Sequence, residues 1–172
     1  MPEDEYLLTN VSVKVEDAKI QNLSKYKSLS KQLPNSRVFG LFRVPLRIYS
    51  LLGGKEGKMG EAPVIYDSIY AKETVRDMRN LLVNSGYLNA DVDYNATTSR
   101  GKKIDVEYIL RPGKPFVVET IETQIEDPTI ASIIKNSNSR PLLEEGMKLD
   151  VIALDNERTR IVEMLQKYGY YR

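Results

Sequence analysis

Pairs of carboxylates are the residues of this sequence that come closest to a catalytic arrangement. Asp91 and Asp93 stand two positions apart, and Glu144 and Glu145 are adjacent. Residues two apart on a strand share a face, and two carboxylates on one face can act as a general acid and a general base. Without a pocket or a third polar partner, however, such pairs are more typical of surface charge.

The composition removes most other catalytic chemistry. The 172 residues contain neither histidine nor cysteine. This excludes thiolate nucleophiles, histidine bases, disulfides and zinc sites built from these ligands. The sequence also has no phosphate-binding glycine loop, nucleophile elbow or EF-hand loop. We therefore predict a protein that is not an enzyme and has no catalytic residues, cofactor or metal site.

A basic and aromatic stretch at 37–49 is a second candidate for function. Its apolar side chains are too many to leave in water, so it either packs on its own domain, binds a partner or lies on a membrane. The net charge of +1 and the lack of an exposed aromatic pair on a strand argue against nucleic acid. The residues that we predict to bind a partner here are Arg37, Phe39, Phe42, Arg43 and Arg47.

The element pattern is clearest between 74 and 116. Helical spacing of Val75, Met78, Leu81 and Leu82 predicts an amphipathic helix, with Asp67–Ser68 as its cap and Gly86 as its stop. Two alternating segments follow, 90–97 and 103–110, separated by the turn residues of 98–101. They predict an antiparallel hairpin.

The residues before this unit predict one more strand and one more helix. Val11, Val13 and Val15 alternate in a strand over 6–15. Asp17 is a plausible N-cap for a helix over 19–33, which ends before Pro34.

A weak internal repeat divides the chain. Residues 120–128 match 10–18 at an offset of 110, and landmarks between Asp150 and Tyr170 match others from Asp67 to Tyr87 at an offset of 83. The difference between the offsets corresponds to an insertion at about 34–60 in the first copy. We expect domains at 5–114 and 115–172, the second with a strand from 120 and a helix over 129–135 but lacking its C-terminal hairpin.

These features resemble a known family. The order strand, helix, helix, strand, strand, with a Gly-Tyr after the second helix (Gly86-Tyr87, Gly169-Tyr170), is similar to POTRA domains, and Arg111–Phe116 resembles the turn that links one POTRA domain to the next. The insertion segment LPNSRVFGLFR resembles the TamA-like lipoprotein variant of Bacteroidetes, within the BamA/TamA superfamily. The resemblance implies an α+β fold of tandem POTRA-like β-α-α-β-β units, each with a small mixed sheet covered by a helix pair, the second unit truncated.

The resemblance also implies a function and a location. It implies a non-catalytic arm at the periplasmic face of the outer membrane, a soluble fragment of a membrane protein. The arm would bind nascent, unfolded outer-membrane proteins or a periplasm-spanning partner and pass clients to its own C-terminal β-barrel. The alternatives are a POTRA scaffold for cell division or two-partner secretion, and a nucleic-acid-binding module.

The same resemblance selects a binding surface. In POTRA folds the strand at 90–97 lies at the sheet edge, where free N–H and C=O groups can pair with an extended client. The polar side chains of this strand argue against client binding, because charges on an edge strand also prevent unwanted pairing. The residues predicted to bind on this strand are Asp91, Val92, Asp93, Tyr94 and Asn95.

Overall fold

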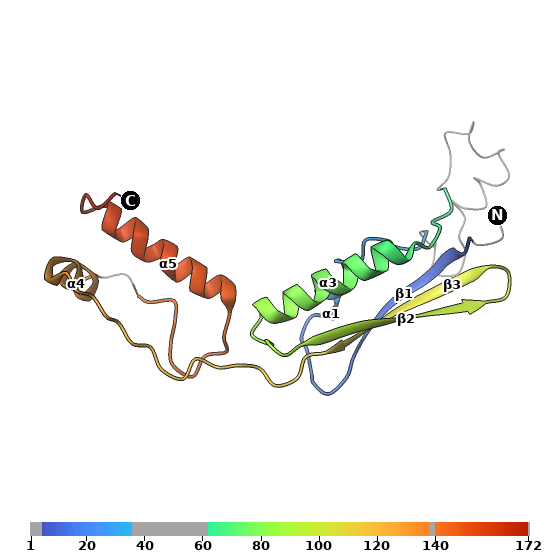
Figure 1. Ribbon diagram of the computed structural model, residues 1–172, viewed down its shortest axis with the longest axis horizontal. Coiled ribbons are helices and arrows are strands. Elements are labelled where there is room, and N and C mark those ends of the chain that lie inside the picture. The colour runs from blue at the N-terminus through green and yellow to red at the C-terminus, as the bar shows by residue number, and fades with distance from the viewer. Residues whose placement is uncertain (1–4, 36–61, 138–139, 172) are drawn as a thin grey trace. The chain divides into compact units, whose positions relative to one another are not determined.

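The computed structural model describes residues 5–35, 62–137 and 140–171 (Figure 1). These residues form two compact units. Unit 1 contains the described residues up to Leu81 together with Ala90–Gly113, and unit 2 contains Leu82–Asn89 together with the described residues from Lys114 onward.

Unit 1 is built on a three-stranded mixed sheet. Its strands are β1 (Leu7–Val15), β2 (Asp91–Ser99) and β3 (Lys103–Arg111), in the spatial order β1-β3-β2. β1 runs parallel to the central strand β3, and β2 pairs with β3 as an antiparallel hairpin. The predicted α+β class and small mixed sheet are confirmed.

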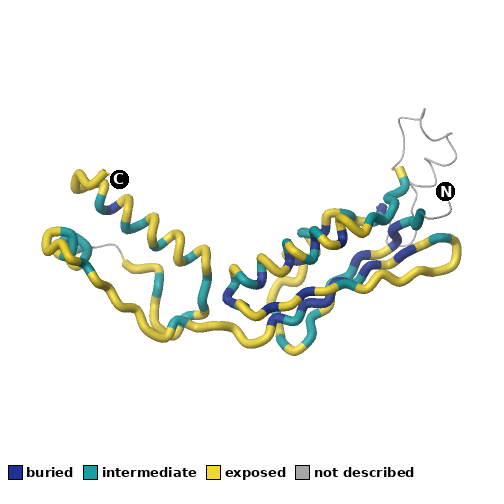
Figure 2. The backbone as a smooth tube through the Cα atoms, viewed as in Figure 1, coloured by how far each residue is buried: buried dark blue, intermediate teal, exposed yellow. Residues whose placement is uncertain are grey.

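One long helix covers one face of this sheet. Helix α3 (Ser68–Asn84) begins as predicted at Asp67, whose Oδ1 accepts the Ile69 N–H at 2.8 Å. Met78 of α3 is fully buried, as is Leu110 of β3. Figure 2 shows the buried positions gathered on α3 and the strands of unit 1. The 3.6-residue period of the helix and the two-residue period of the strands thus meet in one core.

The predicted helix over 19–33 is wrong in extent. Only α1 (Leu23–Lys27) forms, and it packs against β1. Asp17 does not cap it, because Asp17 itself is left-handed at φ 64° and the chain is again left-handed at Asn22. These two turns end the run of right-handed conformation that a longer helix needs.

The residues after α1 bond to the segment before α3 instead of extending the helix. Gln32 donates from Nε2 to the Ile65 carbonyl at 2.8 Å, and its Oε1 accepts the Asp67 N–H at 3.0 Å. Asn35 is buried and makes a similar pair of bonds. Its Nδ2 donates to the Ala62 carbonyl, and its Oδ1 accepts the Val64 N–H. Tertiary hydrogen bonds therefore outweigh local helix propensity here.

Unit 2 contains helices α4 (Pro128–Lys135) and α5 (Val151–Gln166), which pack on each other. Asp127 and Asp150 cap them through their side chains. The predicted strand from 120 does not form. The described pairing in this region is a single bridge between Val117 and Lys148, since the described part of unit 2 offers no further strand for a ladder.

Candidate partner-binding edge of the sheet

Strand β2 is an outer strand of the sheet. All nine of its residues pair with β3, from Asp91 opposite Arg111 to Ser99 opposite Lys103. On its other side, no strand in the described part of the chain pairs with it. An edge strand of this kind presents backbone donors and acceptors that a further extended chain can use.

The side chains of β2 divide between the two faces of the sheet. Val92 lies opposite Leu110 and is buried, and Tyr94 lies opposite Tyr108 and is half-buried. Asp91, Asp93 and Asn95 alternate with them and are exposed. Of the five predicted residues, Val92 and Tyr94 thus anchor the strand to the core, and the other three are exposed polar residues.

An aromatic cluster fixes the middle of β2. The rings of Tyr94 and Tyr108 lie 6.2 Å apart and are tilted by 45°. Burial, together with a hydrogen bond to the Tyr94 hydroxyl, raises the pKa of Tyr66. Burial also raises the pKa of Tyr108, which hydrogen-bonds Thr74 of α3. These contacts hold β2 and β3 to helix α3 and to Tyr66 in the segment before it.

An ion-pair cluster fixes the end of the sheet at which β2 begins. Arg111 of β3 reaches Asp91 of β2 at 3.1 Å and Glu16, just after β1, at 3.2 Å. The Asp91 carboxylate raises the pKa of Arg111, and a hydrogen bond from Lys14 lowers the pKa of Glu16. The pairs are largely exposed, so their energy is small, but they bring the ends of all three strands together.

The opposite edge of the sheet, β1, is partly covered. The Leu8 N–H donates to the Val64 carbonyl at 2.8 Å, and the Tyr66 N–H donates to the Tyr6 carbonyl at 2.9 Å. Together with the contact between α1 and β1, these bonds occupy part of that edge. Of the two edges, β2 is the more accessible candidate.

The other predicted partner-binding residues lie outside the part of the chain that the structure describes. These are Arg37, Phe39, Phe42, Arg43 and Arg47.

The structure also adds polar residues that the sequence prediction missed. β2 continues to Ser99, and Asp105 and Glu107 of β3 lie opposite Thr97 and Asn95 on the polar face. Asp105 and Glu107 alternate with apolar residues along β3, and this two-residue period could have placed them on the polar face from the sequence.

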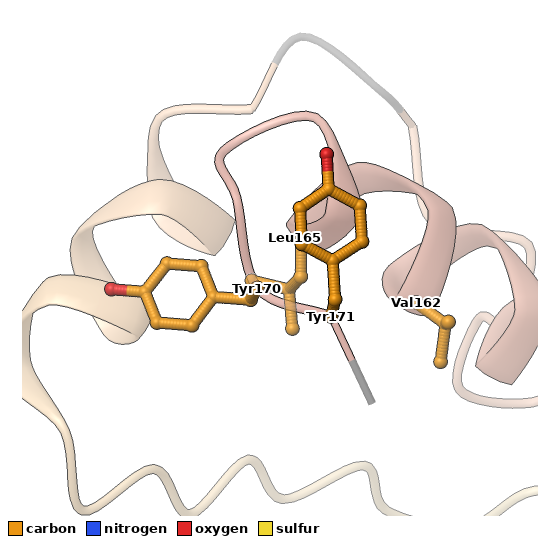
Figure 3. Close-up of a pocket in the computed structure, with 4 residues that line it drawn as sticks. All are labelled: Val162, Leu165, Tyr170 and Tyr171. Carbon is orange, nitrogen blue, oxygen red and sulfur yellow. The ribbon is translucent and has the colours of Figure 1, made fainter.

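Unit 2 has a separate apolar pocket (Figure 3). Val162 and Leu165 of α5 line it together with Tyr170 and Tyr171, which follow the helix. Tyr171 is largely exposed to solvent. This pocket has no charged lining residue and holds no group that suggests chemistry.

The described residues show neither a metal-binding cluster nor a membrane-spanning helix. Within 5–35, 62–137 and 140–171, no group of acidic side chains is placed to hold a metal ion. No helix of that part is both long and apolar enough to cross a membrane.

Comparison with known proteins gives similarity only at the level of structure. Neither a family model nor a curated protein matches the sequence. The chain is similar to the crystal structure of Haemophilus influenzae BamA POTRA3-5, with a TM-score of 0.43, 10% identity and coverage of 97% of this chain and 52% of that chain. It is also similar to POTRA1-2 of the periplasmic domain of Omp85 from Anabaena, with a TM-score of 0.45, 12% identity and coverage of 96% and 82%. This chain spans about half the length of the BamA structure.

Proposed function

We propose that this chain is a non-catalytic POTRA arm of an outer-membrane β-barrel assembly or translocation protein. It binds extended segments of unfolded outer-membrane proteins, or of an assembly partner, by adding them to the sheet as a strand next to β2. The observation that carries the proposal is the free edge of β2, nine residues long, on a sheet that the tyrosine cluster and the Arg111 ion pairs hold in place. Main-chain pairing suits varied clients because it reads the backbone.

The family part of the proposal rests on the sequence. The Gly-Tyr helix ends, the exit turn and the insertion segment support a POTRA pair with domains at 5–114 and 115–172, the second lacking its hairpin. They also support a TamA-like protein of the Bacteroidetes kind, at the periplasmic face of the outer membrane, with its own C-terminal barrel and a periplasm-spanning partner. A docking role for the insertion is proposed from its sequence alone.

The polar face of the sheet disfavours the nucleic-acid alternative. Asp93 lies on that face of the edge strand β2, and Asp105 and Glu107 lie on the same face of the neighbouring central strand β3. Carboxylates there would repel a phosphate backbone, whose binding depends on basic side chains. A scaffold for cell division or two-partner secretion would use the same edge with a different client.

Hydrogen–deuterium exchange on the whole 172-residue chain tests the proposal. We expect a saturating peptide from a transmembrane strand of an outer-membrane protein to slow amide exchange within 91–99 and to leave α4 and α5 unchanged. The control is the same peptide with proline at alternate positions, which removes the N–H groups a ladder needs. Unchanged exchange in 91–99 with the unmodified peptide would contradict strand addition at β2.

A further inference from the structure

Asp93 differs from Asp91, the other charged residue of β2, because its carboxylate accepts a hydrogen bond from the backbone. Its Oδ1 accepts the N–H of Tyr94 at 2.7 Å, in an exposed position. Asp91, by contrast, is paired with Arg111, and none of the ion pairs among the described residues includes Asp93. The Leu110 carbonyl accepts the Glu16 N–H, so Leu110 and Tyr108 direct their backbone groups toward β1, and Ile109 directs its own toward β2. Asp93, opposite Ile109, therefore bonds β3, and the amide of Tyr94 points to the free edge.

The cations nearest Asp93 are already paired with other carboxylates, Arg111 with Asp91 and Glu16, and Lys14 with Glu16. Its cross-strand neighbour on β3 is the apolar Ile109, and the next pair on the same face joins Asn95 to Glu107. Lys14, opposite Ile109 on β1, is already bonded to Glu16 at 3.0 Å. A strand added to β2 would therefore place one of its side chains beside an uncompensated carboxylate.

We propose that Asp93 is the specificity-determining residue of this edge, selecting client strands that carry lysine or arginine on the polar face. While the edge is empty, the carboxylate occupies the Tyr94 amide and guards it. A basic side chain opposite Asp93 draws the carboxylate away, so that one contact both pairs the charges and frees the amide for the client backbone. The inference rests on the proposed strand addition and adds the charge of the client.

The chemistry of cross-strand pairs sets the size of the effect. Opposite charges in directly facing positions favour pairing, and like charges oppose it by a similar amount. For one position this gives a preference of about 2- to 30-fold for lysine over glutamate. The preference should shrink as salt is raised from low to moderate concentration, because the pair is exposed.

Three peptides with the same alternating apolar row test the inference on the whole chain. Their polar rows carry only lysine, only glutamine or only glutamate, and exchange in 91–99 reports binding. We expect the lysine peptide to bind most tightly and the glutamate peptide most weakly. In Asp93→Asn, the affinities for the lysine and glutamate peptides should differ by no more than about 2-fold. The control variant Asp155→Asn, which removes one exposed carboxylate from α5, should leave the preference for lysine unchanged.

A second variant separates guarding from charge selection. Asp93→Ala frees the Tyr94 amide and should strengthen binding of the glutamine peptide by about 2- to 10-fold, the worth of one exposed hydrogen bond. Weaker binding of that peptide to Asp93→Ala would overturn the guarding role. Equal binding of all three peptides at 91–99 would overturn the inference and leave strand addition intact. Binding of none would overturn both.

Discussion

Among the glycines that the structure describes, Gly86 is the one at which an added Cβ would meet a close contact. It ends α3 in the left-handed conformation at φ 84°, with its N–H bonded to the Val83 carbonyl and its own carbonyl accepting the Phe116 N–H at 2.8 Å. A Cβ built on Gly86 would lie 2.2 Å from the carbonyl oxygen of Leu149. Gly86→Ala must therefore displace a backbone segment and cannot simply turn a side chain.

The repeat provides a matched control. Gly169 ends α5 in the same way at φ 90°, and the following tyrosine bonds back to a leucine carbonyl in both copies, Tyr87 to Leu82 and Tyr170 to Leu165. A Cβ on Gly169, however, meets nothing within 4 Å. Alanine at either position incurs the left-handed penalty of about 1–2 kcal/mol. Of these two glycines, Gly86 has the close contact and Gly169 does not.

The difference between the two variants can be worked from the contacts. To relieve a 2.2 Å approach, the Leu149 carbonyl has to move by roughly an ångström, to an ordinary contact distance. That movement disturbs the bond from the Phe116 N–H to Gly86 and the bond from the Leu149 N–H to the Phe116 carbonyl, at 2.9 Å. Two lost bonds are worth about 1–3 kcal/mol. Gly86→Ala should therefore destabilise the hydrogen-bonded segment around Phe116 and Leu149 by this additional amount, relative to Gly169→Ala.

Native-state hydrogen exchange at the amides of Phe116 and Leu149 measures the effect directly. An excess of about 1–3 kcal/mol corresponds to exchange about 5- to 150-fold faster in Gly86→Ala than in Gly169→Ala. Far-UV circular dichroism should show that α3 remains folded in both. If the two variants exchange at these amides within about 2-fold of each other, the reasoning from the Leu149 contact is refuted.

Three further predictions concern a buried hydroxyl, an acid-sensitive ion pair and the insertion. Thr74→Val should lower the free energy of unfolding of unit 1 by about 1–3 kcal/mol in urea denaturation, because the fully buried hydroxyl accepts the Lys31 N–H at 3.0 Å; an unchanged midpoint would contradict this. The hydrogen bond from Arg160 lowers the pKa of Glu157, so this pair stabilises unit 2 above the unfolded pKa near 4.5 and the stabilisation is lost as pH falls through the lower folded value; Glu157→Gln should flatten that acid dependence of thermal unfolding. Replacing 37–60 by a short glycine linker should leave the melting temperature of unit 1 within a few degrees, because hydrogen bonds among described residues join the chain on both sides of it; loss of the cooperative transition would show that the insertion belongs to the core.

The sequence by itself determined those elements whose signals are local. The period of α3, its Asp67 cap and its Gly86 stop, and the hairpin of β2 and β3 all follow from residues close together in the chain. The polar and apolar rows of β2 also follow from alternation, so Asp91, Asp93 and Asn95 could be placed on the exposed face in advance.

Only the tertiary structure decided which contacts compete with those local signals. The helix expected over 19–33 shrinks to α1 because Gln32 and Asn35 bond to the segment before α3. The strand expected from 120 has no partner among the described residues, and a strand without a ladder cannot satisfy its backbone. The bond between Asp93 and the Tyr94 amide, and the approach of Leu149 to Gly86, depend on angles and distances that spacing along a sequence does not encode.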